Sequence, residues 1–215
     1  MRDEEMETLV IEHLTDDFLT GSIRAVFDAR QLAHALCVSD FEPPEAKNLQ
    51  PLIVRGKINE YLRGIAERIP NCTATVEHSK GSPMQRTELR SGPLSLTAHA
   101  VQSPCGEVKR YQYRQSLASG NQPTLFDYDF PVGDTLYVLL LHGPYRARTV
   151  TEQVTYAYLP GSIYLAFPTS GLNCYVHSVN LVSRFPSLVE SLLPKEWDDK
   201  AKIFYRWQAA AREIS

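Results

Sequence analysis

The sequence predicts an α+β protein, because helical and strand-like patterns occupy different parts of the 215-residue chain. Through most of region 1–70, apolar side chains recur every three or four positions, as they do in amphipathic helices. An uninterrupted apolar run at 136–141 has the length of a strand that is buried on both faces. We expect a helical region at 1–70, a mixed α/β region at 71–133 and a mostly antiparallel sheet with a C-terminal helix at 134–215, all of which can belong to one domain.

Helical periodicity in the first region divides into two stretches. One covers residues 4–37, within which Thr15 and the two aspartates that follow it favour a helix start. Pro43-Pro44 must end this stretch, since two prolines cannot continue a helix. The second stretch covers residues 46–69 and ends at Pro70.

Two glycines lie inside the second of these helices. Gly56 and Gly64 each lower the stability of a helix by about 1 kcal/mol relative to alanine. Packing must compensate for this loss, or another group must approach the backbone closely at these positions.

Strand patterns follow residue 70. Short strands of alternating or β-branched residues are expected at 73–76, 87–90 and 94–101. The later sheet is expected to contain a central strand at 135–141, a hairpin of 150–159 with 162–166 that turns at Pro160-Gly161, and a last strand at 175–181.

The segment between these two groups of strands can be interpreted in two ways. Ser103 as N-cap, Pro104 in the first helical turn and Gly120 beyond the end favour a helix. Tyr111 and Tyr113 on alternate positions favour a strand instead. We prefer the helix. At the C-terminal end, residues 187–193 predict a short helix or turn, and Pro194 begins a final helix.

Composition limits the environment and the partners of the chain. The formal net charge of −3 argues against a grip on nucleic acid by the whole domain, although a local basic patch is compatible with it. No apolar run reaches the ~20 residues needed to span a bilayer, and the acidic N-terminus does not resemble a signal peptide. We therefore expect a cytoplasmic protein without a membrane partner, in which the four scattered cysteines are free thiols.

Glu107-Val108-Lys109 is the first candidate for chemistry. It resembles the Glu-x-Lys pair of metal-dependent nucleases, in which that pair and an upstream acidic residue lie on adjacent strands and hold Mg²⁺. The resemblance implies Glu88, Glu107 and Lys109 as catalytic residues, with Glu88 in place of the usual aspartate. The expected helix gives a simpler alternative, in which Glu107 and Lys109 are solvated surface residues.

A second candidate follows the central strand directly. His142, Tyr145, Arg146 and Arg148 place an imidazole, a phenol and two guanidiniums in one expected loop. Such a group can bind phosphate or carboxylate, with His142 as acid or base. The alternative is a hairpin turn with its arginines in water.

Neither a metal nor a cofactor is expected outside the nuclease interpretation. His34 with Cys37 and Cys174 with His177 supply zinc-type ligands. On a strand, however, the spacing of Cys174 and His177 puts the two side chains on opposite faces.

Partner-binding residues are expected in two places. Gln122, Leu125 and Phe126 resemble the pentapeptide with which bacterial replication and repair proteins dock on the sliding clamp. Trp197 and Trp207 lie on the expected final helix, which must dock on the sheet or on another chain. A Leu-Phe pair buried between two parts of this chain is the simpler explanation of the first set.

The sequence therefore predicts an intracellular interaction or regulatory module with an unidentified protein partner, because no catalytic set is evident. The alternative is a metal-dependent nuclease, or another enzyme that acts on nucleic acid or a phosphorylated ligand.

Overall fold

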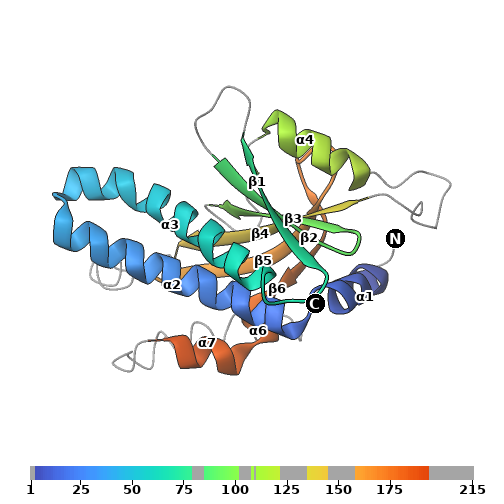
Figure 1. The fold of residues 1–215 in the computed structure, drawn as a ribbon, viewed down its shortest axis with the longest axis horizontal. Helices are drawn as coiled ribbons and strands as arrows, with labels where there is room; N and C mark the ends of the chain where they lie inside the picture. Colours follow the sequence, from blue (N-terminus) through green and yellow to red (C-terminus); the bar gives the residue numbers. More distant parts are fainter. Residues whose placement is uncertain are drawn as a thin grey trace.

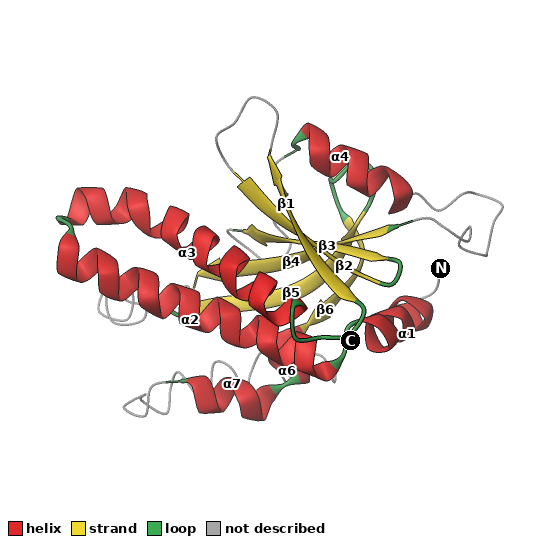
Figure 2. Cartoon of the chain, viewed as in Figure 1, coloured by secondary structure: helices red, strands yellow, loops and turns green. Residues whose placement is uncertain are grey.

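The fold of the chain combines helices with one mixed sheet, as the α+β prediction requires (Figure 1). The computed structural model describes residues 3–78, 85–101, 108, 110–121, 135–144 and 158–193. Most of its helical residues lie in the N-terminal part, and all strands follow them (Figure 2). The sheet takes strands from both the 71–133 and the 134–215 regions.

Three helices begin the chain: α1 (Asp3–His13), α2 (Asp16–Asp40) and α3 (Pro43–Ala66). Thr15 separates the first two as the N-cap of α2, because its side chain accepts a hydrogen bond from the backbone N–H of Phe18. The break between α2 and α3 lies at Phe41-Glu42, as the prolines that follow it predicted. Helices α2 and α3 form an antiparallel hairpin that lies along one side of the sheet (Figure 1).

The sheet has six strands in the order in which they occur along the chain. The strands are β1 (Cys72–His78), β2 (Gln85–Ser91), β3 (Leu94–Ala100), β4 (Leu136–Pro144), β5 (Pro160–Pro168) and β6 (Tyr175–Asn180). All neighbours are antiparallel except β3 and β4, which are parallel. A parallel pair needs a crossover, and α4 (Gln112–Ala118) with the 3₁₀ turn Ser119–Asn121 lies within that connection.

Strand β4 separates two apolar clusters, as expected for a strand covered on both faces. Leu136, Val138 and Leu140 pack towards α2 and α3 in the larger core. Tyr137, Leu139 and Leu141 pack on the other face, with Ala118 of α4 among other residues. The prediction that this strand is central in the sheet is confirmed.

Several predicted boundaries were wrong. Helix α3 covers Pro43–Ala66 and not 46–69, because the two prolines form its first turn. Helix α4 starts at Gln112, and Val108, Arg110 and Tyr111 before it have no regular secondary structure, so Pro104 does not begin this helix. Strand β4 continues past Leu141 to Pro144, which places His142 in the strand and not in a loop. Pro160-Gly161 belongs to β5, because this strand pairs with β4 from Pro160 onwards; residues 150–157 lie outside the described residues.

Two short helices end the described part of the chain: α6 (Leu181–Arg184) and α7 (Pro186–Leu192). The Asn180 side chain caps α6 by accepting hydrogen bonds from the backbone N–H groups of Val182 and Ser183. The second helix confirms the expected helical turn near 187–193. Among the described helices, none combines the length and the apolar character needed to cross a membrane.

Candidate binding face

The two sides of the sheet differ in chemistry at strands β1, β2 and β3. Towards α2 and α3, these strands present apolar residues such as Ala74, Leu89 and Leu96. Side chains alternate along a strand, so the intervening positions point to the side of α4. We call these positions the polar face, and its residues are Thr73, Thr75, Glu77, Arg86, Glu88, Arg90, Ser95, Thr97 and His99.

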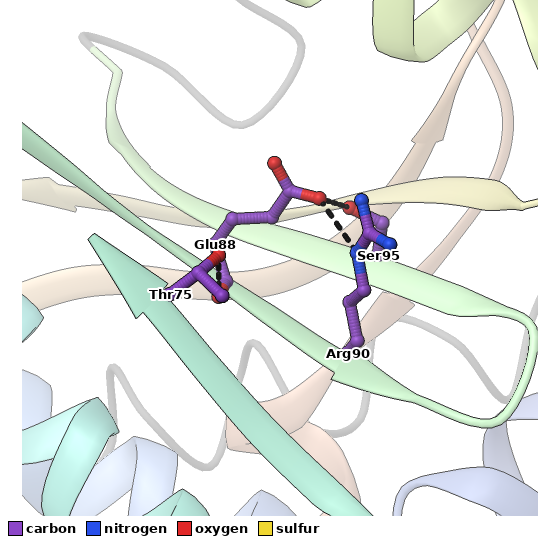
Figure 3. A network of polar contacts seen from close by, with 4 residues as sticks. All are labelled: Thr75, Glu88, Arg90 and Ser95. Atoms are coloured by element: carbon purple, nitrogen blue, oxygen red, sulfur yellow. Dashed lines mark hydrogen bonds and ion pairs between the residues drawn. The ribbon is translucent and has the colours of Figure 1, made fainter. Parts of the chain in front are cut away.

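Glu88 lies on the middle strand of the polar face and is 4 % exposed. Its polar neighbours are Thr75, Arg90 and Ser95 (Figure 3). One carboxylate oxygen, Oε1, accepts hydrogen bonds from Ser95 Oγ and from Arg90 Nε, each at 3.0 Å. The Arg90 side chain is largely exposed, whereas Ser95 is fully buried. The charge of this carboxylate is therefore compensated by one arginine and one hydroxyl group.

Two further polar pairs lie between Glu88 and α4. Thr97 Oγ1 and Tyr137 Oη are 2.6 Å apart, and both side chains are buried. Burial raises the pKa of the Tyr137 phenol above its usual value, so this group stays protonated. Arg114 Nη2 donates to His99 Nδ1 at 2.7 Å, which joins α4 to β3.

Arginine and tyrosine side chains stack at the end of α4 that adjoins β2. The rings of Tyr111 and Tyr113 are nearly parallel, with an angle of 8° and centroids 6.1 Å apart. The guanidinium carbon of Arg86 lies 4.1 Å from the Tyr113 centroid, and that of Arg114 lies 5.4 Å from the same centroid. We call these four residues the Tyr-Arg stack. It brings two positive charges to one aromatic ring.

Arg86 contacts an aromatic ring and not one of the described carboxylates. Within the described residues, no carboxylate forms an ion pair with Arg86, although Glu77 is its cross-strand neighbour on β1. Its Nε is buried and has no hydrogen-bond partner in the described part of the chain. Exposed Arg110 adds a further positive charge just before the stack. Positive charge therefore exceeds negative charge where β2 meets α4.

No metal site is evident in the part of the chain that the structure describes. No group of three or more His, Cys, Asp and Glu side chains there is arranged to hold an ion. His34, Cys37, Cys174 and His177 all lie within the described residues, so they do not form the zinc site that was considered. Cys37 is buried in α2, and Cys174 is exposed before β6.

His142 lies on the other side of the sheet from the polar face. It is paired with Ile163 of β5, and its side chain shares the side of Leu140 and α2. Burial, together with the charges of Arg30 and His99, lowers the pKa of the His142 imidazole to about 3. The imidazole is therefore neutral near pH 7, and its Nδ1 has no hydrogen-bond partner among the described residues.

Of the residues selected from the sequence as catalytic, ligand-binding or partner-binding, the structure describes Glu88 and His142 and places them on opposite faces. The others lie outside the described residues: Glu107, Lys109, Gln122, Leu125, Phe126, Tyr145, Arg146, Arg148, Trp197 and Trp207.

Sequence reasoning missed the Tyr-Arg stack. Its signal is the group of two arginines and two tyrosines at 110–114, where the alternate positions of the tyrosines favour a strand and do not by themselves indicate a binding site. Arg86 had no local signal at all, because 27 positions separate it from Tyr113 and only the fold brings them together.

Comparison with known proteins identifies no relative: no family model matches this chain, and neither a curated protein nor a solved structure matches it.

Proposed function

We propose that this chain is a non-catalytic recognition module and that its polar face, together with α4, binds an anionic group of a partner. The observation that carries this proposal is Arg86, whose guanidinium carbon lies 4.1 Å from the centre of the Tyr113 ring without a carboxylate partner among the described residues. Phosphate is the anion that best matches the planar donor set of a guanidinium. A phosphorylated protein and a nucleic acid both present this group.

Geometry around Arg86 favours an anion over a neutral ligand. Arg86 and Arg114 lie on the same ring, and their like charges repel each other more strongly where water is partly excluded. Arg114 is buried and Arg86 is partly exposed, so an anion that binds at Arg86 relieves this repulsion. Tyr113 meanwhile holds the guanidiniums in place, which reduces the entropy that they lose on binding.

The contacts of the remaining polar groups favour binding over catalysis. Glu88 is held by Ser95 and Arg90, and Tyr137 is kept protonated beside Thr97. Strand β3, which pairs with the strand of Glu88, presents Ser95, Thr97 and His99 on this face. The nuclease interpretation requires a Glu-x-Lys pair on an adjacent strand instead. This supports an interaction module as the leading function and leaves the metal-dependent enzyme as the alternative.

Inorganic polyphosphate tests the proposed anion site, because it carries phosphate without bases or amino acids. We expect isothermal titration calorimetry to detect binding, and Arg86→Ala to weaken it about tenfold through loss of one charge-assisted contact. Lys47→Ala removes one exposed positive charge from α3 and should leave the affinity within about twofold. Equal losses in both variants, or no binding at all, would contradict the proposal.

An assay with Mg²⁺ or Mn²⁺ tests the non-catalytic part of the proposal. The protein is incubated with single- and double-stranded DNA and RNA, beside the Glu88→Gln variant, which keeps the shape of the side chain. We expect no cleavage by either protein. Cleavage by the wild type that Glu88→Gln abolishes would establish the nuclease alternative instead.

A further inference from the structure

We infer that the partner of the polar face is a single-stranded nucleic acid, and that Tyr111 stacks on one of its bases while Arg86 binds a neighbouring phosphate. This inference rests on the proposed function and names the class of its ligand. It starts from the combination of an exposed aromatic ring with uncompensated guanidinium charge, in which each part recognises a different part of a nucleotide.

Exposed ring surface is available for a base. Tyr111 is 48 % exposed, although its ring is held parallel to that of Tyr113 and lies 5.1 Å from the guanidinium carbon of Arg114. Its backbone is extended, with φ −88° and ψ 145°, because it is the residue just before the first turn of α4. An aromatic side chain that is fixed in orientation and open to solvent loses little entropy when a base stacks on it.

Polar groups for the sugar and phosphate lie along the same face. Thr73 and Thr75 of β1 are exposed, and the Thr75 hydroxyl lies beside the strand that carries Arg86 and Glu88. Hydroxyl groups of this kind donate to phosphate and sugar oxygens in nucleic-acid complexes. The polar face therefore continues from the Tyr-Arg stack towards the edge of the sheet.

Charge argues for a single strand over a duplex. The chain has a formal net charge of −3, so its attraction to DNA is local and involves the few arginines near α4. With about two phosphates neutralised, the logarithm of the affinity should fall with the logarithm of the salt concentration with a slope of roughly −1.4. Such weak electrostatics must be supplemented by stacking, and bases are open to stacking only when they are unpaired.

Fluorescence anisotropy with labelled 12-nucleotide probes tests the inference. The probes are an oligothymidylate, an abasic oligonucleotide of the same length and the matching duplex, with inorganic polyphosphate as an unlabelled competitor. We expect oligothymidylate to bind at least tenfold more tightly than the other two probes. Tyr111→Ala should weaken its binding about 5- to 100-fold, the effect of losing one stacked base.

A matched control separates this effect from a general loss of exposed aromatic surface. Phe41 lies between α2 and α3 and is 41 % exposed. Phe41→Ala therefore removes a ring of similar exposure from a segment that precedes the strands of the polar face. It should leave binding unchanged. Circular dichroism and thermal melting establish that both variants fold like the wild type.

The other outcomes overturn the inference in distinguishable ways. In one outcome, the abasic probe and polyphosphate bind as tightly as oligothymidylate, and Arg86→Ala weakens binding of all three whereas Tyr111→Ala does not. This outcome excludes base stacking but supports the proposed anion site. If the duplex binds as tightly as the single strand, the preference for unpaired bases is excluded. If neither polyphosphate nor any oligonucleotide binds, the inference and the proposed function both fail.

Discussion

His142 illustrates at the scale of a residue how burial removes the reactivity that a side chain has in water. Its imidazole is 3 % exposed, lies beneath α2 near Arg30 and stays neutral because its pKa is lowered to about 3. Protonation inside the fold would bring a positive charge close to that of Arg30, in a site from which water is excluded. Acid or base chemistry near neutral pH is therefore not favoured at this position.

Stability should depend on pH through this residue. In the folded protein, the pKa of His142 lies below the ordinary value of 6.5. Between about pH 6.5 and about pH 3, the imidazole therefore binds a proton in the unfolded chain but not in the folded protein. The free energy of unfolding should consequently drop by about 1–2 kcal/mol between pH 7 and pH 5, which urea denaturation measures. His142→Gln should show a smaller drop, whereas the exposed His78→Gln should behave like the wild type. Identical pH profiles for all three proteins would disprove this assignment.

Helix α3 shows how an element tolerates residues that disfavour it. Gly56 and Gly64 both lie inside the helix, and a Cβ atom at either position meets no heavy atom within 4 Å. Of the two alternatives, a close approach of another group to the backbone is therefore excluded at these positions. Packing compensates instead, since Val54, Ile58 and Leu62 of the same helix are buried in the main core.

Replacing Gly56 should accordingly stabilise the protein. Gly56→Ala reduces the conformational entropy of the unfolded chain without a clash, and the free energy of unfolding should rise by about 0.5–1 kcal/mol. Gly21→Ala in α2 is the matched control, because its Cβ would lie 3.1 Å from Ile65 Cδ1 and the crowding offsets the gain. Urea denaturation of the three proteins checks the comparison, and an equal gain from both substitutions would contradict it.

At the scale of the whole molecule, the sheet has a protected centre and an open edge. Strands β4 and β5 are almost entirely buried and have neighbours on both sides. Among the described strands, β1 pairs with β2 alone, and it is mostly exposed. The open part of the sheet includes the polar face. The rigid centre can therefore hold the Tyr-Arg stack in place while the residues near the edge stay accessible to a ligand.

Hydrogen exchange should reveal this division. We expect the amides of β4 and β5 to exchange only through global unfolding, and those of β1 to exchange faster by local opening. Mass spectrometry of peptic fragments or NMR measures both rates. Protection of β1 as strong as that of β4 would show that the edge is more stable than its burial indicates.

Local sequence patterns were sufficient for the α+β class, the two long N-terminal helices and the central position of β4. These features depend on interactions between residues close in the chain, such as the cap at Thr15, the prolines before α3 and the apolar run at 136–141. Glu88 was also selected from the sequence. Its contact with Ser95 was not, because that contact depends on the register of β2 with β3.

Tertiary structure alone decided the remaining features. Residues 108–117 contain signals for both helix and strand, and packing on β4 selected a helix that begins only at Gln112. The contact of Arg86 with Tyr113 forms between β2 and α4, which no pattern within either segment encodes. A local sequence determines the preferences of its own backbone, whereas the convergence of distant side chains is determined by how the elements pack.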